Sequence, residues 1–424
     1  MSQSQFREPG DVIIKSVVLI DKEQRKNLNR LQGKLQKLDS QVVSINIYED
    51  MQCPVLFCTV ELLDAINIVQ SFPIVGEEFI GITIQTPGLP SPVEYFFAVT
   101  SISQGKTGEA SQYQTYTLTC VSEEQLASAA KMTQYAAEGS YSDLVKQIME
   151  RDLETKKPFY IEPTRGLMGN VIPKLKPLAA IDYMRQMAIS QQSTTSAFVF
   201  FETQKGFQFR TIESLIAQNQ KGYIKEFEYL TDVMSQKETS TRSFRNIIKY
   251  EVISRTDTVD KLQTGVLNNV SNGYDLITKS IRQTTHNIAT DIKNFVTPDK
   301  KARAPVTQSL HQQFGQQPAD TFFIPVDSSQ GSIARDLTFA ARRAYTALFN
   351  QNVIRVLIHG DTSLVPGELI DVALPEIKGT SSTKKQDSFN SGRYLVIRLR
   401  HMIIKDVKVK HTISADIVKI GFKA

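Results

Sequence analysis

The chain has 424 residues, of which 41% are hydrophobic and 22% are charged, and its formal net charge is +5. Because domains usually hold roughly 100–200 residues, this length predicts two to four folded units, and the composition supplies apolar residues for more than one core. A net charge this small on a chain this long excludes the strongly basic composition that is typical of nucleic-acid-binding proteins.

The beginning of the chain has the pattern of a β-rich unit. Pro-Gly and Gly turns such as Thr86-Pro87-Gly88 separate short runs rich in β-branched and aromatic residues. These runs predict strands at Val12–Ile20, Val42–Tyr48, Val55–Leu63, Phe79–Gln85, Tyr95–Ile102 and Tyr113–Cys120. Strands at this spacing are typical of a β-barrel or a β-sandwich.

The next region combines helices with strands. Start signals and apolar periodicity predict one helix from Ser122, a second from Ser142 and a third over Leu178–Ile189. Two strands follow at Phe198–Glu202 and Phe207–Ile212, and the short connection between them ends in glycine. The middle of the chain is therefore predicted to be α+β.

A further strand, Ile247–Ser254, precedes a polar region. From about Asp257 to Gln330 the sequence is rich in Gln and Asn and loses clear periodicity, which predicts an extended insertion. Some helix is expected within it around Tyr274–Phe295. The insertion either covers the surface or contacts a partner, and both interpretations stay open.

The last region starts with a predicted helix over Ile333–Asn350, which has small and apolar residues on one face. Strands are predicted after it at Val353–His359, Glu368–Leu374, Tyr394–Arg400 and, with breaks, Val407–Ile420. A polar loop, Gly379–Gly392, lies between two of them.

Two passages resemble each other. Val75–Ile84 and Val365–Leu374 align without gaps, so that Glu78 falls on Glu368 and Phe79 on Leu369. Each is followed by a polar loop and then by a strand that begins with an aromatic residue, Tyr95 or Tyr394. This echo is compatible with two copies of one barrel unit and also with a pattern that recurs by chance in β proteins.

Motifs for metal or cofactor chemistry are missing from the sequence. The three cysteines, Cys53, Cys58 and Cys120, are too few and odd in number for a disulfide framework, and no histidine has a cysteine at metal-ligand spacing. No Walker A loop, Gly-x-Ser-x-Gly elbow or His-Glu-x-x-His sequence occurs. We therefore assign no metal, no cofactor and no catalytic residue.

Membrane and export signals are missing as well. The first residues lack the basic start and apolar stretch of a signal peptide. No run of about 18 apolar residues predicts a spanning helix. The expectation is a protein that folds in a cytoplasm without stable membrane insertion.

Some single residues still invite a chemical interpretation. Glu202 and Glu213 bracket the predicted hairpin and are the first carboxylates to check for glycoside cleavage, although solvated strand or turn positions are the commoner explanation. His359 stands beside Gly360-Asp361 and could pair with the aspartate as a base, although a turn-capping role is the simpler interpretation.

Two basic pairs, Arg342-Arg343 and Arg398 with Arg400, could contact DNA or an acidic partner. Arg398 and Arg400 fall on one face of their predicted strand because side chains alternate with a period of two. A solvated face is the alternative for both pairs.

Several blocks, taken in order, resemble the baseplate hub proteins of contractile-tailed bacteriophages. They also resemble type VI secretion spike hub regions and phage late-control tail proteins. The blocks are Phe200–Ile216, Asn246–Val252, Ala341–Tyr345, Val353–Asp361, Leu364–Ile370 and Ser391–His401.

The resemblance implies an α+β, β-rich fold with two similar tube-type β-barrel domains. Its domains would be a first tube-like barrel over 1–121, an α+β middle domain over 122–240, a split second barrel over 241–256 and 333–424, and a polar insertion over 257–332.

The resemblance also implies a structural virion protein rather than an enzyme. A homotrimeric baseplate hub would join the tail tube to the central spike through a pseudo-hexameric ring, whose lumen passes DNA. Its further partners would be baseplate wedge proteins and the tape measure protein, in a virion tail assembled in the host cytoplasm. The alternative is a tail-associated peptidoglycan or polysaccharide hydrolase or binding module.

Overall fold

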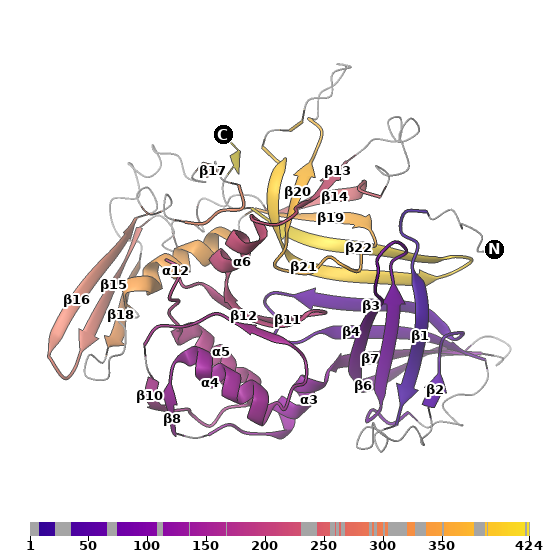
Figure 1. The fold of residues 1–424 in the computed structure, drawn as a ribbon, viewed down its shortest axis with the longest axis horizontal. Helices are drawn as coiled ribbons and strands as arrows, with labels where there is room; N and C mark the ends of the chain where they lie inside the picture. Colours follow the sequence, from indigo (N-terminus) through magenta and orange to yellow (C-terminus); the bar gives the residue numbers. More distant parts are fainter. Residues whose placement is uncertain are drawn as a thin grey trace.

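The structure is a computed structural model of the chain. It describes residues 8–21, 35–65, 74–107, 113–134, 136–166, 168–229, 244–254, 259, 263, 268–287, 291, 295–299, 302–303, 320–326, 336–349, 352–376, 386–387, 389–419 and 422–423. The fold is β-rich with few helices, as predicted (Figure 1). Most of the polar loop predicted over 379–392 lies outside the described residues.

The first barrel consists of the strands predicted at the start of the chain. These are β1 (Ile13–Ile20), β3 (Val42–Asp50), β4 (Phe57–Asp64), β5 (Phe79–Gln85), β6 (Val93–Thr107) and β7 (Gln114–Ser122), with the short β2 (Leu35–Lys37) beside β1. They pair in the order β3-β4-β7-β6-β5-β1. Alternation places Ile45 and Ile47 of β3 in the apolar core, whereas Asn46 and Tyr48 point away from it.

The middle region surrounds a small sheet with helices. Its elements are α3 (Glu123–Ala130), β8 (Ala136–Gly139), α4 (Tyr141–Gln147), the π-helical turn η1 (Ile148–Asp152), β9 (Phe159–Ile161), β10 (Met168–Val171), α5 (Pro177–Met187), β11 (Phe198–Thr203), β12 (Gly206–Thr211) and α6 (Ile212–Asn219). The predicted hairpin is confirmed as β11 and β12.

The caps of the predicted helices differ from expectation. The Ser122 hydroxyl does not cap α3 and instead accepts a hydrogen bond from the Leu56 N–H at 3.2 Å. α4 starts before the predicted Ser142, because Ser140 and Asp143 form a capping box.

The second barrel consists of β13 (Lys225–Glu228), β14 (Ile247–Ser254), β19 (Val353–His359), β20 (Leu369–Ala373), β21 (Gly392–Lys405) and β22 (Val409–Val418). The strands pair in the order β14-β19-β22-β21-β20-β13, and a bridge between Glu228 and Asn246 brings β13 back to the start of β14. The enclosed core includes Ile358, Tyr394 and Ile413.

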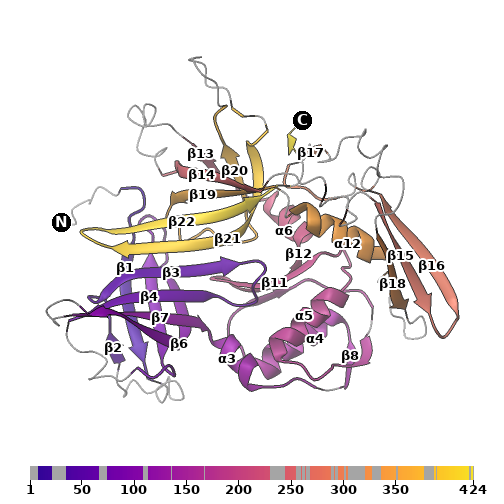
Figure 2. The same ribbon diagram turned by 180° about the vertical axis from the view of Figure 1, so that it is seen from behind.

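The insertion forms an arm at one end of the molecule (Figures 1 and 2). Its strands β15 (Asn268–Asp275), β16 (Ser280–Asn287) and β18 (Asp320–Val326) form a sheet beside α12 (Asp336–Phe349), and β17 (Ala302–Arg303) pairs with β23 (Phe422–Lys423). The helix expected around Tyr274–Phe295 is wrong, because 280–287 pairs along its length with β15. The Asp275 carboxylate accepts from the N–H groups of Ile277 and Thr278, which favours a turn instead of a helix.

The two barrels share a strand plan. β3-β4-β7-β6-β5 and β14-β19-β22-β21-β20 have the same order and the same antiparallel pairing. Both units also have register shifts at two equivalent places, namely Val42/Ser44 with Ile247/Lys249 and Val99/Ser101 with Val396/Arg398. The remaining strands differ, because β1 is antiparallel to β5 whereas β13 is parallel to β20.

The strand registers refine the alignment of the two similar sequence passages, Val75–Ile84 and Val365–Leu374. Phe79 and Leu369 each open the equivalent strand, and the main-chain oxygens of Glu78 and Glu368 accept from the N–H groups of Val99 and Val396, at 2.8 Å and 2.9 Å. The counterpart of Tyr394 is Phe97 rather than Tyr95, since Ile80 lies opposite Phe97 and Ile370 opposite Tyr394.

Candidate assembly interface

The two barrels are joined edge to edge by β3 and β21. The first part of β21 pairs with β20, and the strand then continues so that Arg398–Ile404 pairs antiparallel with Asp50–Ser44. One continuous sheet therefore runs through both barrels (Figure 1). The joint shows how this barrel type binds another of its kind, with main-chain hydrogen bonds between strand edges.

An ion-pair ladder crosses the joint on the face away from the cores. Arg355 contacts Asp416 at 2.7 Å, Arg398 lies 3.9 Å from Asp416, and Arg398 contacts Asp50 at 2.7 Å. The hydrogen bond with Asp416 raises the pKa of Arg355. Because the arginines are about half exposed, we expect the pairs to fix the register more than to add stability.

The predicted basic pair Arg398 and Arg400 does lie on one face, but each side chain has a partner within the chain. Arg400 donates to Asn46 Oδ1 at 3.0 Å and stands over the Tyr48 ring at 5.4 Å. The face is thus polar, and both arginines on it have partners within the chain.

A buried polar cluster lies beneath the joint. His401 Nδ1 and His411 Nε2 are 3.0 Å apart, His401 Nε2 lies 3.9 Å from Glu49 Oε1, and the Tyr95 hydroxyl donates to the same oxygen at 3.3 Å. Burial raises the pKa of Glu49 to about 8 and lowers the pKa of His401 to about 4. Burial, and then the neighbouring His401, lowers the pKa of His411 well below its usual value. The cluster is therefore uncharged at neutral pH.

This cluster was not predicted, although the sequence carries a signal for it. Glu49 follows Ile45 and Ile47 in the apolar phase of β3, and His401 stands in phase with Leu399 and Ile403. A charged or polar residue in the apolar phase of a strand indicates a buried site.

His359 and Asp361 do not form a pair. Asp361 bonds with Lys225 at 2.8 Å and with Ser363, and these contacts outweigh burial and lower its pKa. His359 ends β19 beside Gly10, and burial, followed by Lys410, lowers its pKa. The arrangement fits the turn-associated role and provides no nucleophile.

Glu202 and Glu213 are both buried, so the expectation of solvated positions is wrong. Glu202 bonds with Lys157 at 2.6 Å and accepts from the Leu56 N–H at 3.1 Å, while Lys157 also bonds with Glu124 at 2.7 Å. Burial raises the pKa of Glu202. Glu213 accepts from the Thr195 N–H at 3.2 Å, and burial raises its pKa as well. Each carboxylate has its own partners, which is the pattern of structural groups.

The other basic pair, Arg342-Arg343, lies on α12 and is used within the chain. Arg342 donates to the main-chain oxygens of Gln186 and Ala188, which ties α12 to the end of α5. The Arg343 guanidinium stands over the Phe322 ring at 4.6 Å and links α12 to the arm.

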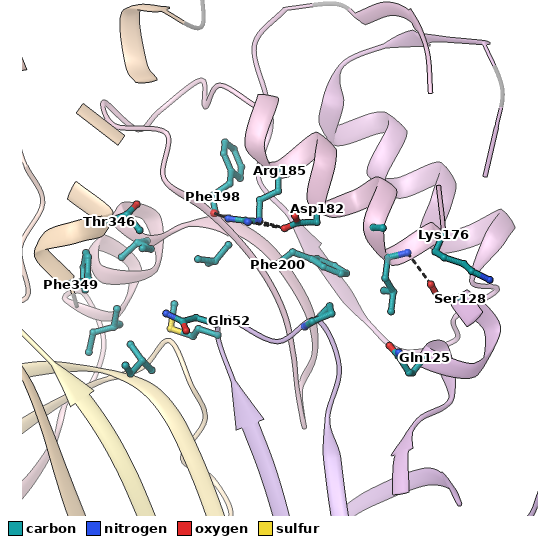
Figure 3. A pocket seen from close by; sticks show the side chains of 18 of the residues that line it. Gln52, Gln125, Ser128, Lys176, Asp182, Arg185, Phe198, Phe200, Thr346 and Phe349 are labelled. Carbon is teal, nitrogen blue, oxygen red and sulfur yellow. Dashed lines mark hydrogen bonds and ion pairs between the residues drawn. The ribbon is translucent and has the colours of Figure 1, made fainter. Parts of the chain in front are cut away.

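A cavity of about 800 Å³ separates the joint from the middle region (Figure 3). Its walls include Met51, Phe198, Phe200, Phe349 and Ile397, so they are mainly apolar. The Phe198 and Phe200 rings stack on Phe209 and Phe207 and are only 3% and 6% exposed, so they offer little surface to a sugar. Asp182, the acidic residue of the lining, is paired with Arg185. The cavity therefore lacks the carboxylate pair of a glycosidase.

Within the described ranges, no helix is long and apolar enough to cross a membrane. The same part of the chain contains no group of three or more His, Cys, Asp or Glu side chains that could hold a metal ion. All three cysteines, which lie in described segments, are free thiols.

Comparisons with known proteins identify the fold. No protein-family model matches the sequence, and no curated protein matches it either. The structure is similar to that of the tail protein from Neisseria meningitidis MC58, at a TM-score of 0.54 and 10% identity over 97% of this chain and 98% of that one. It is also similar to the 43 kDa tail protein of prophage MuSo2 from Shewanella oneidensis, at a TM-score of 0.53 and 9% identity over 95% and 98%. The chain thus has the α+β, β-rich fold of these tail proteins, and the family resemblance drawn from the sequence is confirmed at the level of fold.

Proposed function

We propose that the chain is a non-enzymatic hub subunit of a contractile phage tail or a related injection machine. Three copies form a ring in which six similar barrels surround one axis, and the ring joins the tail tube to the central spike. The observation that carries this proposal is the repeated strand plan, with equivalent bulges, in two barrels that one continuous sheet connects. Two similar units per chain let a threefold assembly match a sixfold tube.

The domain division belongs to the same proposal. We assign 1–121 to the first barrel, 122–240 to the middle domain, 241–256 with 333–424 to the second barrel, and 257–332 to the insertion. α12 and the arm then lie on the side of the middle domain, away from the first barrel (Figure 2).

The ring has a lumen through which DNA passes, and the polar face of the joined sheet is its candidate wall. Positive and negative side chains are paired on this face, as in Arg398 with Asp50 and Arg355 with Asp416. A wall without excess positive charge does not hold DNA by counterion release, so it suits passage rather than binding.

The ring would also contact the baseplate wedge proteins, the tape measure protein and the spike. We propose assembly in the host cytoplasm. A tail-associated hydrolase or sugar-binding module is the other candidate function, but the pairing of Glu202 with Lys157 and the buried rings of Phe198 and Phe200 give it no specific support.

Sedimentation of the purified chain, combined with a peptidoglycan lysis assay, tests the proposal. A stable trimer without lytic activity is expected. A protein that stays monomeric over a wide concentration range, or that clears peptidoglycan, would contradict the hub function.

A further inference from the structure

The two strand edges that are equivalent to the halves of the β21–β3 joint have no strand partner within the part of the chain that the structure describes. Residues 398–404 of β21 pair with β3, but the equivalent residues of β6, 101–107, pair with β7 alone. β14 is the counterpart of β3 and stands at the end of the sheet, paired over its length with β19 alone. The β6 edge is therefore equivalent to the β21 side of the internal joint, and the β14 edge is equivalent to its β3 side.

The solvent exposure of equivalent residues distinguishes the same two edges from the joint. Ile45 and Ile47 of β3 are fully buried and Leu399 of β21 is 2% exposed. Their counterparts by register are Tyr250, Val252 and Ile102, and all three are only half-buried. Ile253, which lies in the register shift between Val252 and Ser254, is 46% exposed. The apolar residues of these edges therefore lack the cover that the joint gives to their equivalents.

We infer that the edge of β6 at 101–107 binds β14 of a second copy of this chain, antiparallel and in the register of the β21–β3 joint. In that register Arg400 lies opposite Tyr48. Tyr48 pairs with Phe57, and Ser254 pairs with the equivalent residue Val353, so Ser103 lies opposite Ser254 of the neighbouring copy. The inference rests on the proposed function, because it names the interface that closes the proposed ring.

A second copy fits these edges better than an unrelated partner. Each chain offers one edge of either kind, so the contact is heterologous and repeats from copy to copy until the ring closes. Joints within and between chains then alternate around the axis, and neither the β6 edge nor the β14 edge stays open to aggregation.

The joint between chains differs from the internal one in its charges. Ser101 replaces Arg398, and Thr119 and Thr59 replace Asp416 and Arg355. The ion-pair ladder thus has no equivalent there, and backbone hydrogen bonds and apolar burial hold the contact. We expect the assembly to resist salt that would screen surface ion pairs.

Disulfide trapping in the full chain tests the register. The double variant S103C/S254C is prepared with C53S, which removes the partly exposed native thiol, and is oxidised at low protein concentration. Directly opposed residues of antiparallel strands have Cα atoms about 4.5–5.5 Å apart, within reach of a disulfide. The expected product is a covalent trimer on a non-reducing gel.

Two matched variants serve as controls. R400C/Y48C opposes cysteines across the internal joint and is expected to form a disulfide without any increase in size. S103C/K249C moves one cysteine four pairing positions along the strand, roughly 13 Å, and is expected to give no covalent trimer.

The outcomes separate this inference from the proposed function. A trimer by sedimentation without disulfides in S103C/S254C, while R400C/Y48C oxidises, overturns the inferred joint and leaves the hub intact. A monomer without intermolecular disulfides overturns both. Equal trapping of S103C/S254C and S103C/K249C also contradicts the register.

Discussion

Replacing Glu49 with glutamine should stabilise the protein increasingly as the pH rises. Glu49 has a pKa near 4.5 when the chain is unfolded and about 8 when burial surrounds it in the fold. Between these values the folded state holds a proton that the unfolded state has released, so the wild-type protein loses stability as the pH rises. Glutamine keeps the contact with the Tyr95 hydroxyl and carries no such linkage.

The size of the stability difference follows from the pKa shift of Glu49. Each pKa unit corresponds to about 1.36 kcal/mol. The variant should therefore match the wild type near pH 4.5 and exceed it by about 3 kcal/mol near pH 7. Above about pH 8 the difference should level off.

Chemical denaturation followed by circular dichroism measures the difference, since the chain has no tryptophan to report unfolding by fluorescence. E94Q is the matched control, because Glu94 is an exposed residue beside Tyr95, and its difference from wild type should not grow with pH. A stability difference between E49Q and wild type that stays constant from pH 5 to about pH 8 would refute the assignment of Glu49 as a buried, protonated carboxyl.

Four further substitutions, one of them a matched control, probe other parts of the fold. K157M leaves Glu202 and Glu124 buried without their counterion and should cost on the order of 3 kcal/mol in denaturation; an unchanged midpoint would contradict the structural role of this triad. G206A should open the β11–β12 hairpin, because φ is 112° and a Cβ would meet the Pro158 oxygen at 2.0 Å. G88A has only the backbone strain of φ 100°, with nothing within 4 Å, so it should destabilise far less, and similar melting temperatures for the two would refute the clash. R398A should change stability by about 1 kcal/mol or less, with the difference vanishing at high salt, and a larger salt-independent loss would contradict the surface ladder.

The strands of both barrels could be predicted because each has one face in a core, so apolar residues alternate, as in Ile45 and Ile47. The arm could not be predicted, since β16 is exposed along most of its length and the pairing of β15 with β16 and β18 depends on tertiary contacts. The turn at Asp275 was the sequence feature that could have indicated a hairpin of β15 and β16.

The candidate site was predictable only in part. Arg398 and Arg400 were placed on one face by the period of two, but their partners Asp50 and Asn46 lie some 350 residues earlier in the chain. No local pattern predicts such a joint. Glu202 was expected in solvent for the same reason, because its counterion Lys157 comes from a distant segment.

Imaging of the purified chain by electron microscopy tests the central proposal most directly. The proposed hub predicts particles with threefold symmetry in which six similar lobes surround a central hole. Particles of single chains, or closed rings whose lobes do not come in two similar sets of three, would contradict it.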